Sequence, residues 1–142
     1  MHPFIRTSLL AAALTLVSAP AFAGISVIVS AKSAAGALDK DTVAQLYLGK
    51  TTALPGGGKA RLYDLADSSA AREHFYQALT GKSASQAKAV WSRLVFSGRA
   101  LPPSELASDA AVVQAVAADP NAVGYVDDSA VNASVKAVAK LP

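Results

Sequence analysis

The sequence predicts an α/β domain, and three observations support this fold class. Short β-branched segments alternate along the chain with longer segments of helical periodicity. Glycine, proline, serine and aspartate stand at the junctions, where turns and helix caps are expected. Residues 24–142 are enough for one compact domain with a single core. A second domain within this length is not expected.

The first two elements are predicted to be a strand and a helix. Residues 25–30 are nearly all apolar and β-branched, which is typical of a central strand covered on both faces. Residues 38–48 predict a helix that Asp39 caps and Gly49 ends. Residues 51–60, with proline and three consecutive glycines, predict a loop.

Two further helices follow a short strand candidate at residues 61–65. Asp67-Ser68-Ser69 is a strong start signal for the first of them, which Gly81 ends. Ser83 and Gln86 have the spacing of a capping box, which predicts the start of the second helix. This helix carries an apolar stripe facing the core, formed by Ala87, Val90, Trp91, Leu94 and Val95.

The last third of the chain predicts one helix and two strands. We expect Asp109 to cap the helix and Pro120 to terminate it. Residues 122–126 and 134–138 are the strand candidates.

The first 23 residues have the three parts of a secretory signal peptide. Residues 1–6 are short and basic, residues 9–17 form an apolar run, and Ala21-Phe22-Ala23 is a small-x-small cleavage signal. The apolar run is too short for a stable membrane-spanning helix. We therefore expect cleavage after Ala23 and a mature domain, residues 24–142, that is free in the periplasm.

Composition excludes several classes of function. The chain has 13 Lys and Arg, 10 Asp and Glu, and no cysteine. The basic residues are spread along the sequence, which is not typical of a nucleic-acid footprint or a polybasic membrane patch. Without cysteine there is no disulfide and no Cys-His catalytic pair.

Six segments, taken in order, resemble the phosphate-type ABC-transporter substrate-binding proteins, a family of type-2 periplasmic binding proteins. Their order and spacing carry the resemblance, which covers nearly all of residues 24–142. The segments are Val27-Ile28-Val29, residues 46–50 (LYLGK), Arg72-Glu73-His74-Phe75, residues 90–98 (VWSRLVFSG), Pro102-Pro103 and residues 121–126 (NAVGYV). The resemblance implies one lobe of that two-lobed fold, with a small mixed sheet flanked by about four helices.

The resemblance also implies a ligand, because that family holds a dehydrated oxyanion between its lobes, largely by helix N-termini and hydroxyls. A helix start presents unpaired N–H groups and a partial positive charge. The candidate ligand-binding residues are therefore Ser68, Ser69 and Ala70, with Arg72 as an electrostatic helper. The implied ligand is phosphate or a similar oxyanion.

The sequence departs from the family pattern at this place. The family signature has an arginine four positions ahead of a Ser-Gly-Thr triplet at the helix start. Here Asp64 or Leu65 stands at the arginine position, and Ser69-Ala70-Ala71 or Ser68-Ser69-Ala70 replaces the triplet. Asp64 would repel an anion if it faced the cleft, unless Arg61 or Arg72 compensates.

Purely structural roles are an alternative for three of the four candidate residues. Ser68 and Ser69 are also what ordinary helix capping requires, and Arg72 could be a solvated surface residue. A lone lobe leaves its ligand face open, so we expect unaided phosphate binding near the millimolar range, about 4 kcal/mol. Tighter binding would need either a dimer that rebuilds the cleft or a separate partner that supplies the other lobe. ABC-transporter membrane components are further candidate partners.

Enzymatic, metal and cofactor functions have little support. The only histidine after residue 23 is His74, no Gly-x-Ser-x-Gly motif is present, and no metal-ligand spacing is recognisable. The pairs Gly49-Lys50 and Gly81-Lys82 lack the upstream glycine of a phosphate-binding loop. We therefore predict a protein that is not an enzyme and has no cofactor.

Two hypotheses about function remain. The first is a periplasmic solute-binding-like protein that recognises an oxyanion at Ser68, Ser69, Ala70 and Arg72. The second is a non-catalytic periplasmic interaction module that keeps the fold, has lost ligand binding and contacts another protein. An exposed apolar patch would favour the second hypothesis.

Overall fold

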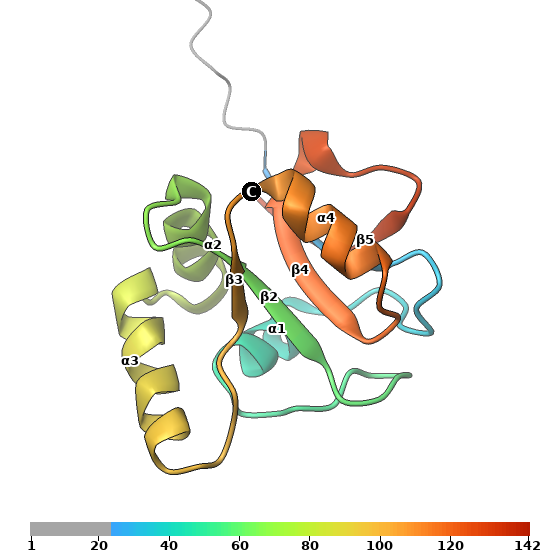
Figure 1. The fold of residues 1–142 in the computed structure, drawn as a ribbon. Helices are drawn as coiled ribbons and strands as arrows, with labels where there is room; N and C mark the ends of the chain where they lie inside the picture. Colours follow the sequence, from blue (N-terminus) through green and yellow to red (C-terminus); the bar gives the residue numbers. More distant parts are fainter. Residues whose placement is uncertain (1–23) are drawn as a thin grey trace, which may run out of the picture.

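The computed structural model describes residues 24–142, so the predicted signal peptide, residues 1–23, lies outside the described residues (Figure 1). Within this range five strands form one sheet of order β3-β2-β4-β1-β5. Strand β1 is antiparallel to β4 and β5, whereas β2 is parallel to β3 and β4. The predicted mixed sheet is confirmed. In chain order the elements are β1 Ile25–Ser30, α1 Lys40–Tyr47, β2 Arg61–Leu65, α2 Ala70–Thr80, α3 Ala84–Phe96, β3 Ser104–Leu106, α4 Asp109–Ala117, β4 Ala122–Asp127, the 3-10 helix η1 Asp128–Ala130 and β5 Val135–Leu141.

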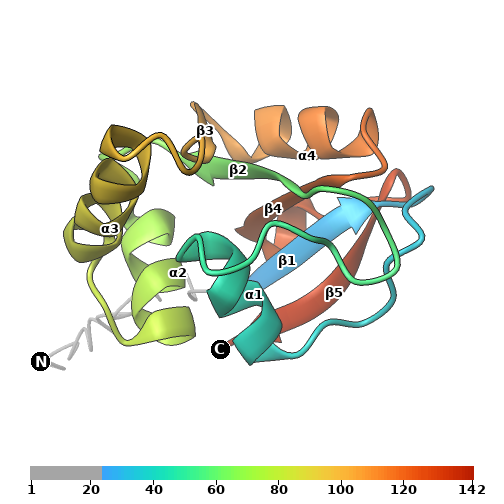
Figure 2. The same cartoon turned by 90° about the horizontal axis from the view of Figure 1, so that it is seen from below.

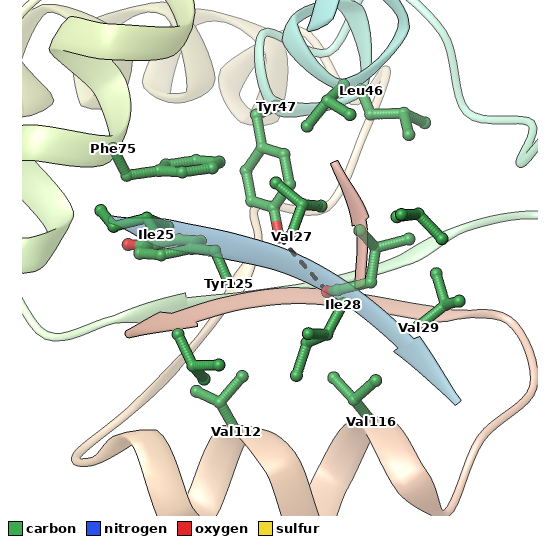
Figure 3. Close-up of a cluster of buried hydrophobic side chains, with 14 of the residues drawn as sticks. Ile25, Val27, Ile28, Val29, Leu46, Tyr47, Phe75, Val112, Val116 and Tyr125 are labelled. Atoms are coloured by element: carbon green, nitrogen blue, oxygen red, sulfur yellow. Dashed lines mark hydrogen bonds between the residues drawn. The ribbon is translucent and has the colours of Figure 1, made fainter. Parts of the chain in front are cut away.

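The helices lie on both faces of the sheet. Helix α4 packs against β4 and β1 on one face, and α1 and α2 lie on the other, as Figure 2 shows. Helix α3 packs against α2 rather than on the centre of the sheet. Figure 3 shows the resulting two-sided core, with Val112 and Val116 of α4 on one side of β1 and Tyr47 and Phe75 on the other. All six residues of β1 are buried, which confirms the central strand.

The predicted helix boundaries of the first half agree with the structure to within two residues. Asp39 caps α1 through a hydrogen bond from Thr42 N to its Oδ1, at 2.7 Å. Gly49 follows α1 with φ of 70°, a conformation that favours glycine. The capping box is also formed, because Ser83 N donates to Gln86 Oε1 at 2.9 Å and Gln86 N donates to Ser83 Oγ at 3.1 Å.

Trp91 is a packing residue, as predicted, but the predicted core-facing stripe is wrong at Val95, which is 43% exposed. Its side chain is buried between α3 and the end of α1, and its indole Nε1 donates to Tyr47 O at 2.7 Å. A Cβ atom built on Gly49 would approach Leu94 Cδ1 to 2.3 Å. The glycine therefore both ends α1 and allows α3 to pack closely there.

The prediction for the start of α4 is wrong by one residue. Ser108 is the N-cap, since its Oγ accepts from Ala111 N at 3.1 Å. The Asp109 carboxylate, which was expected to cap the helix, instead accepts from Asp127 N at 3.3 Å. Strand β3 was not predicted, because three residues beside Pro102-Pro103 carry no clear strand pattern.

An aromatic cluster fills the core between α2 and the sheet. The rings of Phe75 and Tyr125 stack with centroids 3.7 Å apart, and Tyr47 meets Phe75 edge-on at 4.8 Å. Tyr47 also donates its hydroxyl to Tyr63 O at 2.8 Å, which satisfies the one polar atom of its ring. Residues 24–142 include no helix that is long and apolar enough to cross a membrane.

Gly124 sets the distance between β4 and α4. A Cβ atom on Gly124 would lie 2.6 Å from Val112 Cγ1 and 3.0 Å from Val116 Cγ2. We expect Gly124→Ala to lower the free energy of unfolding by about 1–3 kcal/mol, because the helix must move off the sheet. Urea denaturation measures this, with Gly36→Ala as the control, since a Cβ there meets nothing within 4 Å. Equal stability of the two variants would contradict close packing at Gly124.

Candidate oxyanion site

The start of α2 brings three of the predicted site residues together in one turn, namely Ser69, Ala70 and Arg72. Ser69 is the N-cap, and its Oγ accepts from Arg72 N at 3.3 Å. Within residues 24–142, the N–H groups of Ala70 and Ala71 have no hydrogen-bond acceptor. Ser68 precedes the cap and is exposed. The capping role proposed for Ser69 is therefore confirmed, and two further backbone donors stay available beside it.

Arg72 is not a solvated surface residue, so that alternative is wrong. The residue is 4% exposed. Its Nη1 donates to Leu65 O at 2.9 Å and to Glu105 Oε1 at 2.7 Å, and lies 3.0 Å from Asp67 Oδ1. Its Nε is buried without a hydrogen-bond partner, 3.7 Å from Asp64 Oδ1. The guanidinium is thus fixed between the end of β2, the start of α2 and β3.

Asp64 faces the core rather than an open cleft. Its carboxylate accepts hydrogen bonds from Tyr76 Oη, at 2.6 Å, and from Tyr125 Oη. The same carboxylate accepts from Leu65 N at 2.8 Å, and Arg72 supplies the opposite charge. The repulsion expected from Asp64 is therefore largely compensated inside the protein.

The tyrosines beside Asp64 stay protonated. Burial, and then the negative charge of Asp64, raise the pKa of both Tyr76 and Tyr125 far above the usual value. Burial also opposes the charged form of Arg72, but Glu105 and Asp64 outweigh it, so the pKa of Arg72 is raised. The tyrosines act as hydrogen-bond donors and the arginine stays a cation.

Carboxylates outnumber cations around the helix start. Asp64, Asp67 and Glu105 all lie within ion-pair distance of Arg72, and Lys88 Nζ lies 2.7 Å from Asp67 Oδ2. The hydrogen bond from Lys88 lowers the pKa of the Asp67 carboxyl, which therefore keeps its charge. An incoming anion would have to compete with Asp67 for Arg72 and Lys88.

A hollow of about 320 Å³ adjoins this cluster, and we call it the Arg72 hollow. It provides space next to the guanidinium at the surface between α3 and β3. Its lining residues are Asp64, Arg72, Lys88, Trp91, Ser92, Val95, Pro102, Pro103 and Glu105.

Sequence reasoning missed Lys88 and Glu105 as members of this cluster. Lys88 lies on the polar side of α3, where a lysine is ordinary, and Glu105 lies in the unpredicted strand β3. Neither position has a local signal that distinguishes it. His74 lies on α2, with its Nε2 2.5 Å from Pro142 O. The described part of the chain holds no group of His, Asp and Glu able to bind a metal ion.

Comparison with solved structures identifies the fold. A Clostridium perfringens protein described as a phosphate ABC transporter substrate-binding protein, solved with bound phosphate, superposes with a TM-score of 0.67 and 22% identity, over 82% of this chain and 44% of that one. An ABC-type phosphate transport receptor from Vibrio cholerae gives a TM-score of 0.65 and 20% identity, over 82% and 45%. PstS from Borrelia burgdorferi gives 0.57 and 13%, over 73% and 40%.

The chain has the fold of one lobe of a PstS-like periplasmic binding protein. It spans less than half the length of the solved proteins that it matches. No protein-family model matches the sequence, and no curated protein matches it. The structural similarity confirms the α/β fold that the six segments implied.

The buried charge of Asp64 makes Arg72 a strong contributor to stability. We expect Arg72→Ala to lower the free energy of unfolding by about 3–5 kcal/mol, because it leaves Asp64 buried without a cation. Lys88→Ala removes a cation that pairs with an exposed carboxylate, and should change the urea midpoint little. Urea denaturation of both variants distinguishes the two roles. If both variants lost equal stability, the buried pair would not be the more important one.

Proposed function

We propose that this protein is a periplasmic solute-binding-like protein that binds phosphate or a similar oxyanion at the start of α2. The single observation that carries this proposal is the unpaired pair of backbone donors at Ala70 and Ala71, beside a buried arginine. The Ser69 hydroxyl lies at the same helix start, and the exposed Ser68 precedes it. Backbone N–H groups at a helix start are well suited to anions. The solved Clostridium perfringens relative, with its bound phosphate, supports the choice of ligand.

The geometry also predicts how the anion competes. Asp67 forms ion pairs with both Arg72 and Lys88. Its side chain is 59% exposed, so it can rotate into solvent at low cost. A phosphate would then take its place beside Arg72 Nη1 and Lys88 Nζ.

Export through a cleaved signal peptide belongs to the same proposal. So does a partner that supplies a second lobe, or an ABC-transporter membrane component.

Calorimetry with phosphate, sulfate and a neutral solute tests the site. We expect saturable phosphate binding with a Kd on the order of 1 mM. Ser69→Ala and Lys88→Ala should weaken it, because they remove a hydroxyl and a cation. Asp67→Asn should strengthen it several-fold, because the competing carboxylate is gone. Arg72→Ala is a weaker test, since it also unbalances Asp64.

The decisive comparison is between the wild type and Asp67→Asn. Circular dichroism confirms that each variant is folded before titration. If folded wild-type and Asp67→Asn proteins both gave no heat with phosphate at about ten times the expected Kd, binding of a solute by the chain alone would be excluded.

A second candidate function, a non-catalytic interaction module, is favoured by one observation. Phe96 is 96% exposed, Leu101 85% and Val95 43%, all at the end of α3 or in the loop after it. Large exposed apolar side chains that gather in one region mark contact surfaces.

A photo-crosslinking amino acid at position 96 should therefore trap a partner in cells that express the protein. The same group at position 140, on the edge strand β5, should not. Equal trapping at both positions would argue against a contact surface at Phe96.

A further inference from the structure

A second hollow, of about 420 Å³, lies at the end of the sheet where β2 and β3 begin, and we call it the Arg99 hollow. It adjoins the Arg72 hollow, because Trp91 and Pro102 line both. Nothing in the candidate oxyanion site uses it. Its lining residues are Leu46, Thr51, Thr52, Lys59, Ala60, Arg61, Leu62, Trp91, Arg99, Ala100, Leu101, Pro102 and Ser104.

The apolar part of this lining is held in place by the core. Trp91 is anchored by its hydrogen bond to Tyr47 O, and Tyr47 is anchored in turn by its hydroxyl bond to Tyr63 O. Leu46 is fully buried and Leu62 partly so, and the ring of Pro102 fixes the backbone of the facing loop. A preformed apolar surface of this kind costs little to organise when a side chain binds.

The charged part of the lining is entirely basic. It comprises Lys59, Arg61 and Arg99, and no lining residue is acidic. Arg61 Nε lies 3.4 Å from Asp119 Oδ2, but Lys59 and Arg99 have no ion pair within residues 24–142. This distribution is opposite to that of the Arg72 hollow, where each cation already has a carboxylate. The Arg99 hollow therefore attracts negative charge.

We propose that the Arg99 hollow docks an acidic segment of a partner protein, which inserts an apolar side chain against Trp91 and Leu101. The inference rests on the second candidate function and is independent of phosphate binding. Acidic residues of the segment pair with Lys59 and Arg99, and the exposed side chain of Leu101 supplies the outer part of the apolar contact. A free inorganic anion would leave the apolar lining unused. A flat membrane surface would not enter the concavity.

Trp91 is the only tryptophan of the chain, so its fluorescence reports on this region without a label. The probe is a 12-residue peptide of glutamates around a central Leu-Phe pair, free of tryptophan and tyrosine. We expect a saturable change in Trp91 emission that added salt weakens. A peptide with lysine in place of glutamate should give no change, and neither should one with serine in place of Leu-Phe.

Matched charge reversals locate the binding. Lys59→Glu with Arg99→Glu should weaken peptide binding about tenfold or more. Lys32→Glu with Lys140→Glu makes the same change in net charge outside the lining, and should change the affinity less than about twofold. Leu101→Ser, at an exposed position of the lining, should weaken binding while leaving the urea midpoint unchanged.

Three results would overturn the proposal. These are no fluorescence change with the glutamate peptide, equal weakening by both charge-reversal pairs, and binding to anionic phosphatidylglycerol vesicles that the peptide does not displace. Calorimetry with phosphate on the same preparations keeps the two functions separate. The charge reversals at residues 59 and 99 leave the α2 site untouched, so phosphate binding is scored independently of peptide binding.

Discussion

The pairing of buried Asp64 with buried Arg72 is the interaction on which the arrangement of the candidate site depends. A carboxylate in the core is costly unless a cation and several hydrogen-bond donors surround it. Arg72 and Tyr76 supply them from α2, and Tyr125 supplies one from β4. The need to compensate the Asp64 carboxylate therefore links the end of β2 to helix α2 and to the neighbouring strand β4. It also fixes the guanidinium, so the helix start is rigid before any ligand arrives.

The same constraint determines how an anion can be held. Arg72 cannot follow a ligand outward, because that would leave Asp64 uncompensated. Its Nη1 is already engaged by Leu65 O, Asp67 and Glu105. Ser69 can cap the helix and contact an anion together, since the cap uses its oxygen as an acceptor and leaves its hydroxyl proton to donate. The specificity of this site for an anion therefore depends more on which carboxylate the anion can displace from Arg72 than on the number of hydrogen-bond donors.

Local signals in the sequence predicted most of the fold. Caps at Asp39, Ser69 and Ser83 depend on side chains that bond the backbone three residues away, so they can be recognised without tertiary structure. The start of α4 was misassigned because Ser108 and Asp109 are both good caps. Only the tertiary contact of Asp109 with Asp127 N distinguishes them. The short parallel strand β3 depends on its partner β2 and has no periodicity of its own.

The position of the helix start at α2 could be predicted from the sequence, but the charges that surround it could not. The Asp-Ser-Ser start of α2 located the unpaired N–H groups, because these follow from helix geometry alone. The sequence indicates only that Arg72 could offset the charge of Asp64. It does not show that the two side chains are buried together, because they lie eight positions apart with a strand end between them. Lys88 and Glu105 come from elements distant in sequence, and only the packing of α3 and β3 brings them to Asp67 and Arg72.

The two adjoining hollows show that net charge is a poor guide to the surface of this protein. The chain has a formal charge of only +3, yet the linings of its two adjoining hollows differ in their charges. At the α2 end Arg72 and Lys88 are neutralised by three carboxylates, whereas at the other end Lys59 and Arg99 have no acidic neighbour in the lining. Trp91 and Pro102 form the apolar boundary between the ends. A small anion must displace a carboxylate at the first end, whereas at the second end Asp119 pairs with Arg61 alone and an acidic chain meets no competitor at Lys59 and Arg99.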